Sequence, residues 1–260
     1  MKSIIYYFSG TGNNFAIAKE ITNRLGDSTL LPISGLLNNK IIPEEYEWVG
    51  FVVPSYFSHV PPYVEKCMRD IVYSEKQKIF LVVGCGGNRG LSIQDMRKHV
   101  NNSNKDVALE YMITLPGNYI LSYGAFPIWY QKLCIKLSCR KIRRITRDIT
   151  DNRIRKNLNK GIFYKEKYES ALQQSIAKFS ITGKQYKVND NCSSCGSCMK
   201  ICPTENISMS NGKVEFGNGC SQCMGCIQWC PHNAIDYQGK AINRKKYHHL
   251  NIKKYEMFIR

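Results

Sequence analysis

The sequence predicts an α/β domain built on a doubly wound parallel sheet, followed by a second, smaller α+β domain. The first prediction comes from the alternation of short apolar runs with amphipathic stretches over the first 130 residues. The second comes from eight cysteines that lie in two copies of one spacing. We expect four segments: a sheet domain at 1–130, a basic helical connecting segment at 131–185, a cysteine domain at 186–240 and a basic tail at 241–260.

The apolar runs of the first domain are the expected strands. They are Ile4–Phe8, Leu30–Ile33, Val49–Val53, Ile79–Val83 and a weaker fifth, Val107–Thr114. Between them, the amphipathic stretches Asn14–Leu25, Pro62–Val72 and Leu91–Val100 are the expected helices. This alternation implies parallel strands with helices on both faces, and ligands of such sheets bind at the carboxyl ends of the strands.

Three loops at those carboxyl ends carry candidate binding residues. The loop after the first strand is Gly-rich and polar, so its backbone can approach an anion beside a helix N-terminus. It lacks the third glycine of the dinucleotide fingerprint and the Lys-Ser/Thr of a P-loop. The third strand leads into aromatic side chains that can stack on a flat ring, and the fourth into glycines. The candidates are Ser9, Thr11, Gly12, Asn13, Asn14, Pro54, Ser55, Tyr56, Phe57, Cys85, Gly86, Gly87 and Asn88.

The cysteine motif is duplicated with an offset of 28 residues at every cysteine and at both following prolines. The copies run Cys192-x2-Cys195-x2-Cys198-x3-Cys202-Pro203 and Cys220-x2-Cys223-x2-Cys226-x3-Cys230-Pro231. Zinc is the alternative, but zinc knuckles explain neither the third cysteine nor the prolines nor the repeat. Asn211-Gly212, between two short β-like stretches, predicts a hairpin over Ile207–Ser210 and Lys213–Phe216.

Residues 186–240 resemble the bacterial two-cluster ferredoxins, whose fourth cysteine ligates the other cluster. The resemblance implies two [4Fe–4S] clusters with crossed ligands. One is held by Cys192, Cys195, Cys198 and Cys230, and the other by Cys220, Cys223, Cys226 and Cys202.

Residues 1–130 resemble a flavodoxin, because a phosphate-type loop follows the first strand and ring-flanking loops follow the third and fourth. The resemblance implies strand order 2-1-3-4-5 and FMN as the ligand. Two positions depart from the family, which commonly has Thr at the places of Asn14 and Gly84. The whole chain, including Pro116-Gly117-Asn118-Tyr119, is similar to the flavodoxin–ferredoxin fusion proteins, which are mostly inferred electron carriers of anaerobes.

The net charge of +17 is concentrated outside the candidate sites: residues 131–187 hold 16 Lys/Arg against 4 Asp/Glu. This excess predicts a solvated helix face or a dock for an acidic redox partner, and no recognised motif supports nucleic-acid binding. No stretch has the roughly 20 uninterrupted apolar residues of a membrane span, and the start resembles no export signal, so we expect the cytoplasm.

Single residues outside the motifs leave alternatives open. Cys85 is a redox thiol near the ring or a small packing residue, and His59 is a proton donor to the ring or a surface histidine. Tyr56 is the preferred stacking residue, with Phe57 as its substitute. The pair His248-His249, among basic neighbours, is expected at the surface.

The sequence as a whole predicts an electron-transfer flavoprotein that relays electrons between FMN and two [4Fe–4S] clusters, and on to an unidentified redox partner. One alternative is a flavin-dependent reductase, with a small substrate over the FMN and the clusters as its electron source. Another is a redox-sensing protein associated with nucleic acid. The sequence does not give the donor, the acceptor or the oligomeric state.

Overall fold

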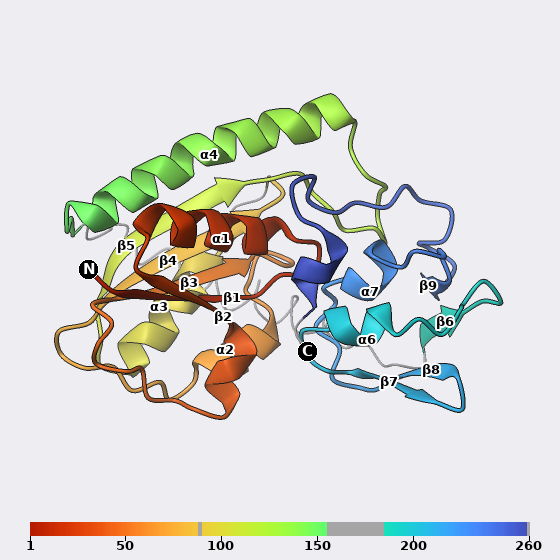
Figure 1. The fold of residues 1–260 in the computed structure, drawn as a ribbon, viewed down its shortest axis with the longest axis horizontal. Helices are drawn as coiled ribbons and strands as arrows, with labels where there is room; N and C mark the ends of the chain where they lie inside the picture. The colour runs from red at the N-terminus through yellow and green to blue at the C-terminus, as the bar shows by residue number, and fades with distance from the viewer. Residues whose placement is uncertain (88–89, 155–184, 259–260) are drawn as a thin grey trace.

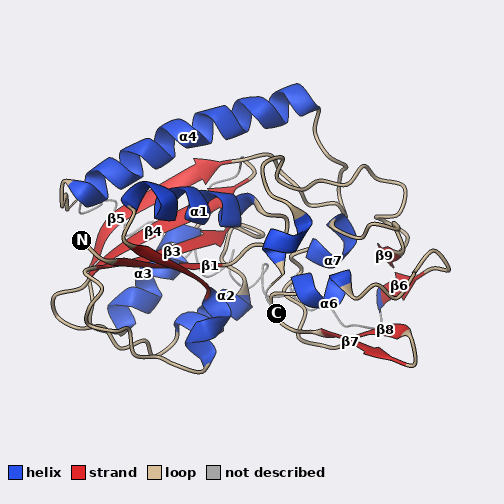
Figure 2. Ribbon diagram, in the orientation of Figure 1, coloured by secondary structure: helices blue, strands red, loops and turns tan. Residues whose placement is uncertain are grey.

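The computed structural model describes residues 1–87, 90–154 and 185–258. The first domain is a five-stranded sheet between two helical layers, and the cysteine-rich domain lies at the carboxyl edge of that sheet (Figures 1 and 2). The C-terminus lies between the two domains (Figure 1).

The sheet has the order β2-β1-β3-β4-β5, and every pair of neighbouring strands is parallel. Its strands are β1 (Ser3–Tyr7), β2 (Ser28–Pro32), β3 (Trp48–Pro54), β4 (Lys78–Cys85) and β5 (Val107–Thr114). This is the flavodoxin order, so the predicted fold class is confirmed. The three inner strands, β1, β3 and β4, are buried along almost their whole length, as strands covered on both faces must be.

Helices cover both faces of the sheet (Figure 1). On one face, α2 (Pro62–Met68) and α3 (Ser92–Asn102) bury Val64, Met68 and Met96, with the short 3-10 helix η1 (Ile33–Leu37) beside them. On the other face lie α1 (Asn13–Leu25) and α4 (Ile128–Thr150). The helix expected at Pro62–Val72 ends early, because Arg69 is extended and Asp70 has φ of 60°.

The long helix α4 forms part of the helical layer of the first domain. Its buried residues Ile142, Ile145 and Ile149 pack in the same core as Ile17 and Ile21 of α1. We expected residues 131–185 to be a basic helical connection. The described part of that segment is the helix from residue 131 onward, the four residues after it and residue 185, and residues 155–184 lie outside the described residues.

The cysteine domain contains two short helices and two small antiparallel pairs. The helices are α6 (Ser197–Ile201) and α7 (Gly225–Gln228), and the pairs are β6 (Tyr186–Val188) with β9 (Ile235–Tyr237) and β7 (Ile207–Ser210) with β8 (Lys213–Phe216). The second pair is the predicted hairpin, closed by Asn211-Gly212 with positive φ at both residues.

The tail folds back onto the first domain and ends in the 3-10 helix η3 (Lys254–Met257). The expectation of a surface histidine pair is wrong for His249, which is only 4% exposed, whereas His248 is exposed. The backbone N–H of His249 donates to the carbonyl of Thr11 (3.0 Å), and Ile252 packs in the core of the first domain. The tail thus packs against the loop after β1 and holds it in place.

Candidate functional site

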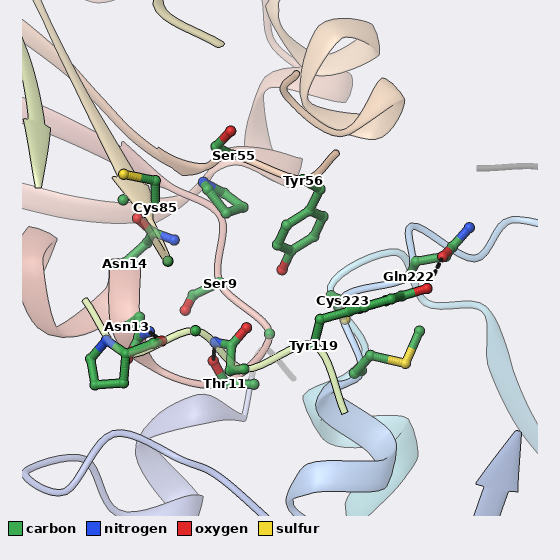
Figure 3. A pocket seen from close by; sticks show the side chains of 18 of the residues that line it. Ser9, Thr11, Asn13, Asn14, Ser55, Tyr56, Cys85, Tyr119, Gln222 and Cys223 are labelled. Atoms are coloured by element: carbon green, nitrogen blue, oxygen red, sulfur yellow. Dashed lines mark hydrogen bonds between the residues drawn. The ribbon is translucent and has the colours of Figure 1, made fainter. Parts of the chain in front are cut away.

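A pocket of about 410 Å³ lies at the carboxyl edge of the sheet, where the loops after β1, β3, β4 and β5 meet. Figure 3 shows polar side chains of the β1 loop on one side and Tyr56 and Tyr119 across the space from them. This is the place at which a sheet of this order binds its ligand. Ten of the predicted binding residues line the pocket: Ser9, Thr11, Asn13, Asn14, Pro54, Ser55, Tyr56, Phe57, Cys85 and Gly86.

The loop after β1 is held rigidly by hydrogen bonds. The backbone N–H of Gly12 donates to the hydroxyl of Ser9 (3.1 Å), and the Asn13 amide donates to the carbonyl of Pro116 (3.3 Å). The buried hydroxyl of Tyr247 in the tail donates to Oδ1 of Asn13 (2.6 Å). Gly12 lies in the loop with φ of 92° and does not line the pocket. The loop leads directly into α1, whose N-terminal dipole favours an anion.

The two departures from the flavodoxin pattern lie against each other. A Cβ at Gly84 would be 2.3 Å from Oδ1 of Asn14, so any side chain there would collide with that amide. The larger Asn14 therefore occupies space that the missing side chain leaves open. Its buried Oδ1 has no hydrogen-bond partner in the described structure, although the side chain lines the pocket. A buried acceptor of this kind is expected to meet a donor on a ligand.

The loops after β3 and β4 supply the aromatic and glycine walls. Burial, together with the nearby thiols of Cys223 and Cys220, raises the pKa of Tyr56 well above its ordinary value, so its hydroxyl stays neutral. Phe57 has positive φ and meets Tyr119 edge-on, with ring centroids 5.3 Å apart. Gly87 does not line the pocket, and Asn88 lies outside the described residues.

His59 is not a surface residue and does not line the pocket. It is 1% exposed, and its Nδ1 lies 3.0 Å from the carboxylate of the buried Asp95. The same carboxylate accepts the backbone N–H of Val60 (3.0 Å). The histidine therefore fixes the loop after β3 to α3.

One wall of the pocket comes from the cysteine domain, which sequence reasoning did not predict. Gln222, Cys223 and Met224 line the pocket beside the loop after β1. A Cβ at Gly10 would lie 2.2 Å from the carbonyl oxygen of Cys223, so the two backbones are in direct contact. The indole N–H of Trp229 donates to the carbonyl of Gly10 (3.0 Å). These contacts form only when the two domains pack together, so local sequence patterns do not predict them.

Loop residues after β5 complete the pocket. Pro116, Gly117, Asn118 and Tyr119 all line it. They form the stretch that carries part of the resemblance to the flavodoxin–ferredoxin fusion proteins. Asn118 donates to the hydroxyl of Thr11, and its carbonyl accepts the side-chain amide of Gln228 (2.8 Å). This loop therefore connects the loop after β1 to the cysteine domain.

The eight motif cysteines gather around two separate hollows. One hollow is lined by Cys192, Cys195, Cys198 and Cys230, and the other by Cys202, Cys220, Cys223 and Cys226. The fourth cysteine of each motif thus lies with the first three of the other copy. The sulfurs also accept backbone N–H groups at equivalent places, because Asn206 donates to Cys202 and Ala234 to Cys230, both at 3.3 Å.

This arrangement fits a cubane cluster better than a single ion. Four thiols spread around a hollow suit a larger inorganic core, and N–H groups directed at sulfur are typical of iron–sulfur sites. Burial raises the pKa of the Cys223 and Cys226 thiols, and bound iron would take the place of their protons.

Comparison with known proteins agrees with the division of the chain into a sheet domain and a cysteine domain. A model of the 4Fe-4S dicluster domain family matches residues 191–235. No curated protein matches the chain. Together with the strand order of the sheet, the match confirms the predicted combination of a flavodoxin-like domain and a 4Fe-4S dicluster domain.

Solved structures resemble the first domain at low identity. An archaeal flavodoxin is 17% identical and covers 56% of this chain and 99% of its own, with a TM-score of 0.36. A flavodoxin of Streptococcus pneumoniae TIGR4 is 12% identical, covering 58% and 99%, with a TM-score of 0.42. A flavoprotein of Lactobacillus acidophilus in complex with FMN is 12% identical, covering 43% and 92%, with a TM-score of 0.33.

Proposed function

We propose that this protein is an electron-transfer flavoprotein, in which FMN and two [4Fe–4S] clusters form one relay to a redox partner. The observation that carries the proposal is the shared wall. Residues of one cysteine set, Cys223 and its neighbours Gln222 and Met224, line the same pocket as the loop after β1. When bound, FMN would exchange two electrons and each cluster one, so the protein would join two-electron to one-electron chemistry.

Different loops of the pocket would bind different parts of the FMN. The loop Ser9–Asn14 and the N-terminus of α1 would hold the phosphate through backbone N–H groups and side-chain donors. Tyr56 or Phe57 would stack on the ring, and the backbone at Cys85 and Gly86 would face its edge. The buried Oδ1 of Asn14 would accept a hydrogen bond from the ligand.

The two cysteine sets would take different places in the relay. The set Cys202, Cys220, Cys223 and Cys226 adjoins the pocket and would hold the proximal cluster. The set Cys192, Cys195, Cys198 and Cys230 would hold the distal cluster, and Cys195 is exposed. A partner would therefore exchange electrons at the distal cluster.

The pocket favours a carrier over the alternative reductase. Its volume of about 410 Å³ is toward the lower end of the range of ligand pockets, about 300–1,000 Å³. The cysteine domain also closes it on one side. A reductase would need room for a substrate beside the flavin.

The partner and the compartment follow from charge and cysteine use. A net charge of +17 suits an acidic redox protein, and a chain with many thiols but no paired cysteine among its described residues suits the cytoplasm. No described helix is long and apolar enough to cross a membrane.

The test is cofactor analysis of protein purified without oxygen. We expect about eight irons, about eight acid-labile sulfides and one FMN per chain. Eight irons without flavin, even after FMN is added, would leave a ferredoxin on an empty scaffold. Zinc in place of iron and sulfide would contradict the proposal entirely.

A further inference from the structure

The outer face of α4 exposes a row of large apolar side chains. Trp129 is 69% exposed, and Leu133 and Leu137 are each 45% exposed. Their spacing of four residues places them on adjacent turns of one side of the helix. The inner face of the same helix is buried in the core of the first domain. The outer row is therefore not needed for folding.

The row continues into the loop before α4 and reaches the pocket. Tyr123, which lines the pocket, contacts Phe126 (ring centroids 5.5 Å apart), and Phe126 contacts Tyr130 (5.2 Å). The exposed members of this apolar strip are Tyr123, Phe126, Ile128, Trp129, Leu133 and Leu137. Contiguous exposed apolar surface of this kind marks an interaction site rather than a random feature of a soluble surface.

Cations accompany the apolar strip along the whole helix. Lys132 and Lys136 lie beside it, and Arg140, Arg143, Arg144 and Arg147 follow it toward the C-terminus, all exposed. The one acidic residue of α4, Asp148, is buried and lies 3.8 Å from Arg144 and 3.3 Å from Arg153. Asp148 thus offsets the charge of Arg144, and no other carboxylate of α4 offsets the remaining cations of its outer face.

We propose that the outer face of α4 docks on an anionic phospholipid bilayer and holds the protein at the membrane surface. A helix of 23 residues is about 34 Å long. Trp and Leu would enter the interface between headgroups and acyl chains, while Lys and Arg extend to lipid phosphates. The mixture of one apolar row with cations of one sign is complementary to that surface.

Two other polyanions explain less of this face. Nucleic acid would use the arginines but would leave Trp129, Leu133 and Leu137 in water. An acidic electron-transfer partner would meet the exposed Cys195 of the cysteine domain, whereas α4 packs on the sheet of the first domain (Figure 1). The bilayer accounts for both the charge and the apolar row.

Tryptophan fluorescence gives a direct test, because the chain has three tryptophans and only Trp129 is exposed. Trp48 is fully buried and Trp229 is 6% exposed. The loaded protein is mixed with vesicles of phosphatidylcholine alone or with added phosphatidylglycerol. We expect a blue shift and co-sedimentation with the anionic vesicles only, both reduced by salt. The shift should disappear in Trp129→Phe.

Variants separate the apolar from the ionic contribution. Arg140→Gln with Arg143→Gln should weaken vesicle binding by about fivefold for each arginine at low salt. Leu133→Ser with Leu137→Ser should weaken it by about tenfold or more. Ile41→Ser, at a residue that is 63% exposed on the sheet domain, and Lys213→Gln, on the cysteine domain, are the matched controls and should bind normally.

Three outcomes would overturn the proposal. They are absence of binding to anionic vesicles, equal loss in the control variants, and salt-sensitive capture of DNA without vesicle binding. Iron content and circular dichroism of each variant show that it is folded and loaded. Because these readouts do not depend on electron transfer, the membrane proposal and the relay can fail separately.

Discussion

The two cysteine motifs share one spacing but lie in different surroundings. In the second copy, Gln222, Cys223 and Met224 line the pocket of the sheet domain. The residues 28 positions earlier, Ser194, Cys195 and Gly196, face solvent or are half-buried. Burial raises the pKa of Cys223, whereas hydrogen bonding with Ser197 lowers the pKa of Cys195. One motif is thus enclosed by the other domain, and its copy is open.

The backbone of the two copies is the same, and the side chains differ where function differs. Ser194 and Gln222 both have φ of 54°, and Gly196 and Met224 are both left-handed N-caps, of α6 and α7. Glycine suits that conformation, whereas methionine there costs about 1 kcal/mol. Met224 is nevertheless 2% exposed and forms part of the pocket wall. The two copies therefore share the loop conformation. In the enclosed copy, the backbone strain at Met224 accompanies the burial of its side chain in the pocket wall.

The largest effect should come from removing one ligand of each set. Cys223→Ala and Cys195→Ala should each lower iron from about eight to about four atoms per chain. Only Cys223→Ala should also stop electron exchange between flavin and the remaining cluster, because its set adjoins the pocket. Anaerobic iron assays and light-driven flavin reduction followed by absorbance measure both. Uninterrupted exchange in Cys223→Ala would reverse the assignment of proximal and distal sets. Cys139→Ala, at a thiol that lines neither the pocket nor the hollows, is the control.

The contact that encloses the second motif can be broken at Gly10. A Cβ there would meet backbone atoms of Cys223, which cannot move cheaply, so Gly10→Ala should lower the free energy of unfolding by about 3 kcal/mol and weaken FMN binding. Gly35→Ala is the control, since a Cβ at Gly35 meets nothing within 4 Å. Denaturant unfolding and flavin titration measure the two effects. Equal stability of the two variants would show that the domains do not pack as described.

Acid should lower the free energy of unfolding, because it protonates His249 in the tail that packs against the loop after β1. Burial, and to a smaller extent His248, lowers the pKa of His249 from 6.5 to about 4, so its neutral form is favoured in the folded state. This contribution to stability is full above pH 6.5 and is lost as the pH falls toward 4. Between pH 6.5 and 5 we expect a loss of about 2 kcal/mol.

His249→Gln should remove most of that pH dependence, while His248→Gln, at an exposed residue, should keep it. Urea unfolding at several pH values is the measurement. An unchanged slope in His249→Gln would assign the acid sensitivity to another group.

The smallest effects are expected from substitutions at the two left-handed N-caps, Met224 of α7 and Gly196 of α6. Met224→Gly should relieve about 1 kcal/mol of backbone strain but weaken FMN binding by about tenfold, because a wall of the pocket is lost. Gly196→Ala, at the equivalent place in the open copy, should cost about 1 kcal/mol and leave FMN binding unchanged. Flavin fluorescence quenching and thermal unfolding separate affinity from stability. If both variants alter flavin affinity alike, the difference between the copies is not functional.

Much of the fold could be read from local patterns. The strands and helices of the first domain follow from apolar periodicity, and the hairpin β7–β8 follows from Asn211-Gly212. The sheet order was implied by the resemblance to flavodoxins. The resemblance to two-cluster ferredoxins implies the grouping of Cys202 and Cys230 with the opposite copies, and the same sets of cysteines line the two hollows. Such features repeat or lie close together in the chain, so one sequence is enough to reveal them.

The remaining features depend on tertiary contacts. The compensation between Asn14 and Gly84 joins α1 to β4, and each residue by itself is only a departure from a family pattern. His249 stands among basic and polar neighbours that give no sign of its burial behind Thr11. Gln222 and Met224 look like variable loop positions until the two domains meet. Docking of one domain on another leaves no periodicity in either.

The central claim is that the set of Cys202, Cys220, Cys223 and Cys226 holds the cluster next to the flavin. A crystal structure of anaerobically purified protein, with anomalous scattering at the iron edge, tests it most directly. The account predicts two four-iron clusters with crossed ligands, and flavin density in the pocket beside Gln222, Cys223 and Met224. A cluster held by the four cysteines of one motif, or flavin nearer to the set that contains Cys195, would contradict it.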